Sequence, residues 1–143
     1  MARMYPEEYR EDAESPSEAE RILYHEFKKQ LPEEFLVFHR RSWHAPNAAG
    51  SARDGETDFV IAHEKLGILV VEAKSGGVAR EPKTGNWHAM GYDGRRTHSI
   101  DNPIEQAMRC QKSLVRRLKE IPRGAKRWWT VGHALAFPEI RFD

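Results

Sequence analysis

The sequence has little of several features that would narrow its class at once. It contains one cysteine in 143 residues, which excludes a framework of internal disulfides and suits a reducing cytoplasm. No apolar run approaches the roughly 18 residues of a membrane-spanning helix, and the N-terminus has no apolar signal core. No group of Cys and His has the spacing of zinc ligands. These absences predict a cytoplasmic, globular chain of about one domain.

An overall excess of charge is also missing, because the net charge is only +1. The charges are nevertheless unevenly spread: residues 1–34 carry ten acids against five bases, and residues 95–127 carry ten bases against three acids. A basic C-terminal half attracts phosphate backbones. A balanced surface with accidental blocks of charge would give the same counts, so composition alone leaves nucleic-acid binding open.

What is present is a segment, residues 55–74, that predicts a β-hairpin. Its arms, 57–62 and 68–73, are rich in Val, Ile, Leu and Phe, which favour strands. A short, mostly polar turn separates the arms. If the turn is centred on Lys65, Asp58 faces Glu72, because each lies seven residues from the centre. Opposed residues share a face, with Cβ atoms roughly 5 Å apart, and Lys74 follows on the same face.

Two acids and a lysine gathered on one face indicate a metal site. Like charges directly opposite one another destabilise a sheet, by about 4 kcal/mol at roughly 4 Å and an effective dielectric of about 20. A divalent cation such as Mg²⁺, which one or two carboxylates hold in proteins, would remove that cost. A solvated charged face is the alternative. Against it, the second arm is apolar on both sides, which is typical of a strand that is covered on both.

A first helix is predicted to start at Ser15-Pro16-Ser17-Glu18, with Ser15 as the cap, and to run to about Gln30. Residues 1–14 before it are expected to form a frayed, acidic leader. Glu20 flanks the apolar stripe of the helix and Glu26 lies nearer its centre, and periodicity does not decide which of them reaches a site. The stripe consists of Ala19, Ile22, Leu23, Phe27 and Gln30/Leu31.

A second helix is predicted from the cap at Asn102 to about Glu120. Gln106 lies in its first turn, away from the apolar stripe, and points either at a ligand or at water. Four basic residues share another face, which either tracks a phosphate backbone or is simply solvated; they are Arg109, Lys112, Arg116 and Lys119. The expected inner stripe is Ile104, Ala107, Met108, Gln111, Leu114, Val115 and Leu118.

Three further strands are predicted, over residues 35–43, 87–92 and 128–137, the last of them buried. The order is then a helix, three strands that include the hairpin, a short strand, a second helix and a last strand. This order predicts an α/β sandwich around a mixed sheet.

Several of these segments together resemble the NERD, or nuclease-related, domain, a family similar to the PD-(D/E)xK nucleases. They are Glu-Thr-Asp-Phe-Val (56–60), Val-Glu-Ala-Lys (71–74), the region of Trp87, and Asn-Pro-Ile-Glu-Gln (102–106). The resemblance covers roughly residues 15–138. It implies a restriction-endonuclease-like core, in which a mixed sheet made of an antiparallel meander and a later strand is flanked by helices. It also implies a NERD-like domain over 15–143 that forms the N-terminal piece of a longer protein or associates with a helicase or ATPase domain.

The resemblance implies a metal-dependent nuclease that hydrolyses phosphodiester bonds, of DNA rather than RNA. Its second-strand acid matches Asp58, and its ExK motif matches Glu72 and Lys74. The implied cofactor, Mg²⁺ or Mn²⁺, would be held by Asp58, Glu72, the carbonyl of Ala73 and, through water, the first-helix acid, which best matches Glu20.

Lys74 would orient the attacking water, Gln106 would position Lys74 or the phosphate, and the four basic residues of the second helix would hold the strand. Cys110 departs from the pattern, because related nucleases often have tyrosine four residues after the glutamine. A nucleic-acid-binding module without chemistry and a docking domain for a helicase are the rival hypotheses, and none of the three involves a membrane. The complete set of Asp58, Glu72 and Lys74 favours the enzyme.

Overall fold

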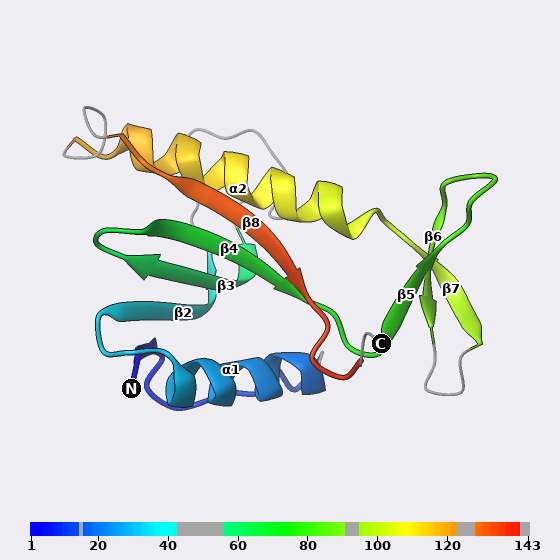
Figure 1. Ribbon diagram of the computed structural model, residues 1–143, viewed down its shortest axis with the longest axis horizontal. Helices are drawn as coiled ribbons and strands as arrows, with labels where there is room; N and C mark the ends of the chain where they lie inside the picture. The colour runs from blue at the N-terminus through cyan, green and yellow to red at the C-terminus, as the bar shows by residue number, and fades with distance from the viewer. Residues whose placement is uncertain (15, 43–55, 91–94, 123–127, 141–143) are drawn as a thin grey trace.

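The computed structural model describes residues 1–14, 16–42, 56–90, 95–122 and 128–140. It places a mixed five-stranded sheet between helices α1 (Glu18–Gln30) and α2 (Pro103–Glu120), with a smaller sheet standing at one end (Figure 1). The main sheet contains β1 (Arg3–Tyr5), β2 (Phe35–Ser42), β3 (Glu56–His63), β4 (Gly67–Ala73) and β8 (Val131–Ala136) in that spatial order. The smaller sheet contains β5 (Gly77–Arg80), β6 (Trp87–Met90) and β7 (Arg96–Ile100).

The main sheet has antiparallel pairs at its centre and parallel pairs at both edges. β3 pairs with β2 and β4 in antiparallel fashion, whereas β1 runs parallel to β2 and β8 runs parallel to β4. The predicted α/β class with a central mixed sheet is therefore confirmed. No helix in the described part of the chain is long and apolar enough to cross a membrane.

The β3–β4 hairpin has the register that the sequence predicts. The ladder pairs His63 with Gly67 and Phe59 with Val71, so it is symmetric about Lys65. Gly67 lies at φ +101°, and a Cβ atom there would come within 2.3 Å of the carbonyl oxygen of Thr130. Only glycine fits both the backbone conformation and this close approach, and glycine therefore fixes where β4 begins.

Helix α1 covers one face of the sheet. Its Ala19 and Tyr24 pack against Val37 of β2 and against Phe59 and Val71 of the hairpin, and all five side chains are buried. Full burial of one large apolar side chain contributes about 1.5–3 kcal/mol. This face therefore accounts for much of the stability of the core.

The predicted start of α1 is wrong by two residues. Ser17, not Ser15, is the N-cap, and its hydroxyl accepts a hydrogen bond from the backbone N–H of Glu20. Ser17 is held in this place because its hydroxyl also lies 3.4 Å from that of Ser75, beyond the end of β4. The predicted end of the helix at Gln30 is confirmed.

The expected frayed leader is wrong for the first residues of the chain. Arg3–Tyr5 forms β1, and Ala2 and Met4 are 6% and 4% exposed within the α1-side core. The hydroxyl of Tyr24 donates to the carbonyl of Pro6 at 2.6 Å. Residues 7–14 are not wholly frayed either, because Tyr9 packs against the α1-side core and Asp12 pairs with Arg40.

Helix α2 covers the opposite face of the sheet, and its predicted bounds are confirmed. The side chain of Asn102 caps it by accepting from the backbone N–H groups of Ile104 and Glu105. The predicted inner stripe is partly wrong, because Ile104 and Met108 are 43% and 36% exposed. The buried face consists of Pro103, Ala107, Cys110 and Leu114.

The error in the inner stripe of α2 has a simple geometric cause. Ala107 and Leu114 are buried as expected, whereas Pro103 and Cys110 each lie one position before an expected residue, which is about 100° around the helix. The small side chains of Ala107 and Cys110 allow α2 to approach the sheet closely, where Cys110 and Leu114 meet Val60 and Val70. The larger Ile104 and Met108 are left at the flank.

Two strands of the smaller sheet were not expected. The sequence predicts one short strand over 87–92, whereas β6 is flanked by β5 and β7 in an antiparallel sheet. None of the side chains described in these strands is fully buried, so they carry little of the apolar pattern on which the prediction rests. The last strand is shorter than predicted and only partly buried, and Trp128 is 90% exposed.

Candidate active site

Asp58 stands at an irregular point of β3. The ladder with β4 ends at the pair Phe59–Val71, and the ladder with β2 passes from His39–Phe59 to Arg41–Thr57 without pairing Asp58. The carboxylate of Asp58 instead accepts a hydrogen bond from the backbone N–H of Ala73 at 2.8 Å. The side chain of Asp58 thus takes over the pairing with β4 at the point where the backbone ladder ends.

Asp58 and Glu72 come together at this opening, as the register predicts. Their carboxyl groups are close enough to hydrogen-bond when one of them is protonated. Burial raises the pKa of Asp58 to about 8, and the charges of Glu72 and then Glu20 add to the effect. The pair therefore favours the retention of a proton, because ionising two adjacent carboxyl groups away from water is costly.

Glu72 is held by two neighbours that the sequence did not suggest. The hydroxyl of Thr57 donates to its Oε1 at 2.6 Å, and the thiol of Cys110 on α2 lies 3.6 Å from the same oxygen. Burial, followed by the nearby charge of Glu72, raises the pKa of Cys110 to about 12. Cys110 therefore stays a thiol and acts as a weak donor.

Lys74 and Gln106 also meet, as the resemblance implies. The Nζ atom of Lys74 donates to Oε1 of Gln106 at 3.1 Å, which joins the end of β4 to the first turn of α2. Within the described residues, Lys74 forms no ion pair with Asp58 or Glu72. The lysine thus lies on the expected strand end without neutralising the carboxyl pair.

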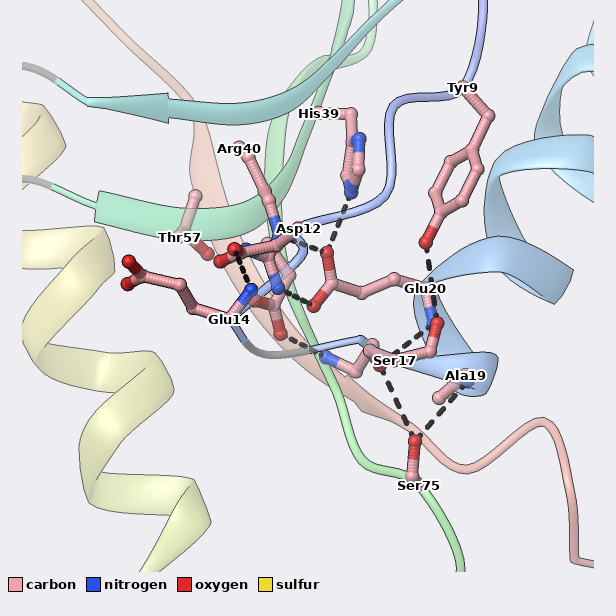
Figure 2. A network of polar contacts seen from close by, with 12 residues as sticks. Tyr9, Asp12, Glu14, Ser17, Ala19, Glu20, His39, Arg40, Thr57 and Ser75 are labelled. Atoms are coloured by element: carbon pink, nitrogen blue, oxygen red, sulfur yellow. Dashed lines mark hydrogen bonds and ion pairs between the residues drawn. The ribbon is translucent and has the colours of Figure 1, made fainter.

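Glu20 lies in a separate network on the α1 side (Figure 2). Its side chain is 4% exposed. One oxygen lies 2.6 Å from Nε2 of His39 and accepts from Nε of Arg40, and the other accepts from Nη2 of Arg40. Burial alone would raise the pKa of Glu20, but the hydrogen bonds from Arg40 and His39 outweigh it and hold the pKa at about 2. The alternative acid, Glu26, is only partly buried and contacts Gln30.

An unusual backbone conformation brings Arg40 to Glu20. Strand alternation places Val37 and His39 toward α1, and it would place Arg40 on the other face, level with Asp58. Arg40 instead has φ +48°, a left-handed conformation that a residue with a side chain adopts at a cost of about 1 kcal/mol or more. The guanidinium reaches the α1 side, where it also pairs with Asp12.

The carboxyl pair fits a Mg²⁺-type cation better than a zinc-type one. Among the described residues, no cluster of three or more His, Cys, Asp or Glu side chains could hold a metal ion. Mg²⁺ needs only one or two carboxylates beside water and substrate oxygens, a number that Asp58 and Glu72 would meet. Glu20 does not contact the pair, although its charge reaches Asp58.

The four basic residues of α2 that were predicted to share a face lie on its outer side. All four are exposed, whereas Ala107, Cys110 and Leu114 point to the sheet. The face is therefore available to a polyanion, as its helical spacing predicts, and its role stays a prediction. The four are Arg109, Lys112, Arg116 and Lys119.

Four residues that contact Glu72 or Glu20 were not among the predicted site residues. They are Thr57, Cys110, His39 and Arg40. A weak signal existed for two of them, because Thr57 adjoins Asp58 and Cys110 stands one helical turn from Gln106. His39 and Arg40 had none, since a strand residue that contacts a helix nearly 20 positions away leaves no local pattern.

Comparison with known proteins gives one family. A family model described as NERD, the nuclease-related domain, matches residues 15–138. No curated protein and no solved structure matches the chain.

Proposed function

The chain belongs to the nuclease-related domain family, and from that premise we propose that it is a metal-dependent nuclease acting on nucleic acid, DNA rather than RNA. The observation that carries the proposal is the pair of Asp58 and Glu72. Glu72 is buried and Asp58 is partly buried, and among the described residues no cationic side chain pairs with either of them. Two carboxyl groups brought together in this way raise the free energy of the folded state, and a bound cation would lower it.

Asp58, Glu72 and the carbonyl of Ala73 would hold Mg²⁺ or Mn²⁺. When bound, such an ion polarises a phosphate oxygen and lowers the pKa of a coordinated water. Gln106 holds the ammonium group of Lys74 by a 3.1 Å hydrogen bond. That ammonium is the donor we assign to the negative charge that develops on the scissile phosphate.

Glu20 and the outer face of α2 take supporting roles in this proposal. The Glu20 carboxylate, held ionised by Arg40 and His39, would accept a hydrogen bond from a water at the edge of the site. Exposed basic side chains of α2 would bind the phosphate backbone, where each neutralised phosphate makes binding more sensitive to salt. They are Arg109, Lys112, Arg116 and Lys119.

The decisive substitution is Lys74→Ala, tested on labelled single- and double-stranded DNA and on RNA, with Mn²⁺ or with EDTA. We expect cleavage by the wild-type protein only with the metal, and a loss of at least about 100-fold in the variant. Lys65→Ala is the matched control, because Lys65 is an exposed lysine in the turn of the same hairpin. Undiminished metal-dependent cleavage by Lys74→Ala, with the fold intact by circular dichroism, contradicts the assignment.

One observation favours a second candidate, a nucleic-acid-binding or helicase-docking module without chemistry. Both oxygens of Glu20 are already used by Arg40 and His39, as in a purely structural ion pair. Titration calorimetry with Mn²⁺ separates the candidates. An absence of binding, or binding unchanged in Asp58→Asn, supports the second candidate.

A further inference from the structure

We propose that Thr57 is a positioning residue that fixes the carboxylate of Glu72 for cation binding, an inference that rests on the proposed function. The hydroxyl of Thr57 lies 2.6 Å from Oε1 of Glu72. Thr57 and Glu72 are 3% and 4% exposed. Water therefore does not compete for the bond, and a hydroxyl that donates to a carboxylate at this distance forms one of the stronger hydrogen bonds in proteins.

The backbone explains how Thr57 reaches Glu72. β3 leaves the β4 ladder after the pair Phe59–Val71 but remains paired with β2 at Thr57–Arg41. Thr57 is thus anchored by its main chain on one side while its side chain faces the part of β4 that the ladder no longer holds. The hydrogen bond from the Thr57 hydroxyl to Glu72 thus joins β3 to β4 where the backbone ladder between them has ended.

The hydroxyl does not need Glu72 in order to be satisfied in the fold. The carbonyl oxygen of Val71 lies 3.4 Å from Oγ1 of Thr57 and offers a second acceptor. When both carboxyl groups are ionised, as a bound cation requires, Thr57 is the one strong side-chain donor to Glu72 among the described residues, because Cys110 offers only a weakly hydrogen-bonding thiol at 3.6 Å. Loss of the hydroxyl should therefore free the Glu72 side chain more than it disturbs β3.

Both donors end on Oε1 of Glu72. The second carboxylate oxygen is consequently the one left to a cation beside Asp58. Hydrogen bonds that orient a metal-binding carboxylate typically change metal affinity about 10- to 100-fold when they are removed. That range sets the effect expected here.

The test is Mn²⁺ affinity, measured by titration calorimetry and by the electron paramagnetic resonance of bound Mn²⁺, without any substrate. Thr57→Val keeps the shape of the side chain and removes the hydroxyl, and we expect it to weaken binding about 10- to 100-fold. Thr57→Ser retains the hydroxyl, and its Mn²⁺ affinity should stay within about threefold of that of the wild type. Thr130→Val is the matched control, because this exposed threonine lies at the other end of the hairpin, beside Gly67.

Thr57→Ala is measured alongside, since it removes the hydroxyl without adding a methyl group in its place. If either hydroxyl-free variant folds and binds Mn²⁺ as tightly as the wild type while Asp58→Asn loses binding, the role of Thr57 is overturned and the metal site stands. If Asp58→Asn binds Mn²⁺ unchanged, the proposed function is wrong and the role of Thr57 fails with it. Mn²⁺ binding by Thr57→Ser that is as weak as that of Thr57→Val also overturns the inference.

Discussion

Two carboxylate sites lie close to each other in this protein and differ in how their negative charge is compensated. Glu20 is fully compensated: Arg40 and His39 engage both of its oxygens and hold its pKa at about 2. Among the described residues, the pair of Asp58 and Glu72 receives backbone, hydroxyl and thiol donors but no cationic one, and the pKa of Asp58 rises to about 8. The first site is an internal ion pair, whereas the second favours the retention of a proton.

The conformation of Arg40 separates the two sites. An ordinary strand conformation would put its side chain on the face of Asp58, which lies opposite it in the register of β2 and β3. The left-handed backbone, at φ +48°, sends the guanidinium to Glu20 instead. Strained residues of this kind persist only where surrounding contacts stabilise them, and they cluster at functional sites.

Asp58→Asn should produce the largest contrast between function and stability. We expect the variant to lose Mn²⁺ binding, because one of the two carboxylates of the pair is removed. The cleavage rate should fall by at least about 1,000-fold. The metal-free protein should nevertheless become more stable at pH 8, by about 1 kcal/mol, since the repulsion with Glu72 disappears. Calorimetry, a cleavage assay and urea unfolding measure the three quantities. A variant that is less stable than the wild type at this pH would remove the basis for the contrast.

Arg40→Ala should do the reverse at the other site. Breaking a buried ion pair by removing one partner costs about 3 kcal/mol or more, because Glu20 keeps only His39. Arg40→Gly should cost about 1 kcal/mol less than Arg40→Ala, as glycine adopts a positive φ without strain. Urea unfolding compares the two variants directly. Equal stability would mean that the backbone of residue 40 is not strained.

The two sites should also change the free energy of unfolding with pH in opposite directions. One should produce an acid limb, where stability falls as the pH decreases, and the other an alkaline limb, where stability falls as the pH increases. The lowered pKa of Glu20 contributes stability that is complete above about pH 4.5 and is lost as the pH falls toward 2. The raised pKa of Asp58 acts in the other sense: the native state retains a proton that the unfolded state releases, so stability falls as the pH rises from about 4 to about 8.

Without metal, the protein should therefore be most stable near pH 4–5, the interval between these two limbs. Glu20→Gln should flatten the acid limb and Asp58→Asn the alkaline limb, as measured by urea unfolding in EDTA. A saturating concentration of Mn²⁺ should also remove the alkaline limb, because the cation displaces the proton. An alkaline limb that survives in Asp58→Asn would assign it to another group.

The smallest effect is expected from the outer face of α2. The double variant Lys112→Ala/Arg116→Ala should weaken nucleic-acid binding and reduce the slope of log affinity against log salt by about 2. Mn²⁺ affinity should not change, because both side chains are exposed on the outer side of the helix. The matched control is Lys29→Ala/Lys65→Ala, which removes the same charge elsewhere. An equal loss of binding in the control would mean that net charge, rather than this face, binds the strand.

Some features of the protein follow from local sequence patterns alone. The turn about Lys65 and the alternation of the two arms predict the hairpin register and bring Asp58 to Glu72. The cap at Asn102 predicts the start of α2. These features depend on neighbouring residues in the chain, and the combination of motifs also identifies the family that the comparison confirms.

Tertiary packing decided the rest. The burial of Glu20, the left-handed Arg40 and the bond from Thr57 to Glu72 join residues on different elements, so no periodicity announces them. From the sequence alone, the hairpin register brings Asp58 to Glu72, whereas helical periodicity left open whether Glu20 or Glu26 reaches a site. The folded protein places a cation beside Glu20 and, among the described residues, none beside Asp58 and Glu72, because the left-handed backbone of Arg40 turns its side chain to the α1 side.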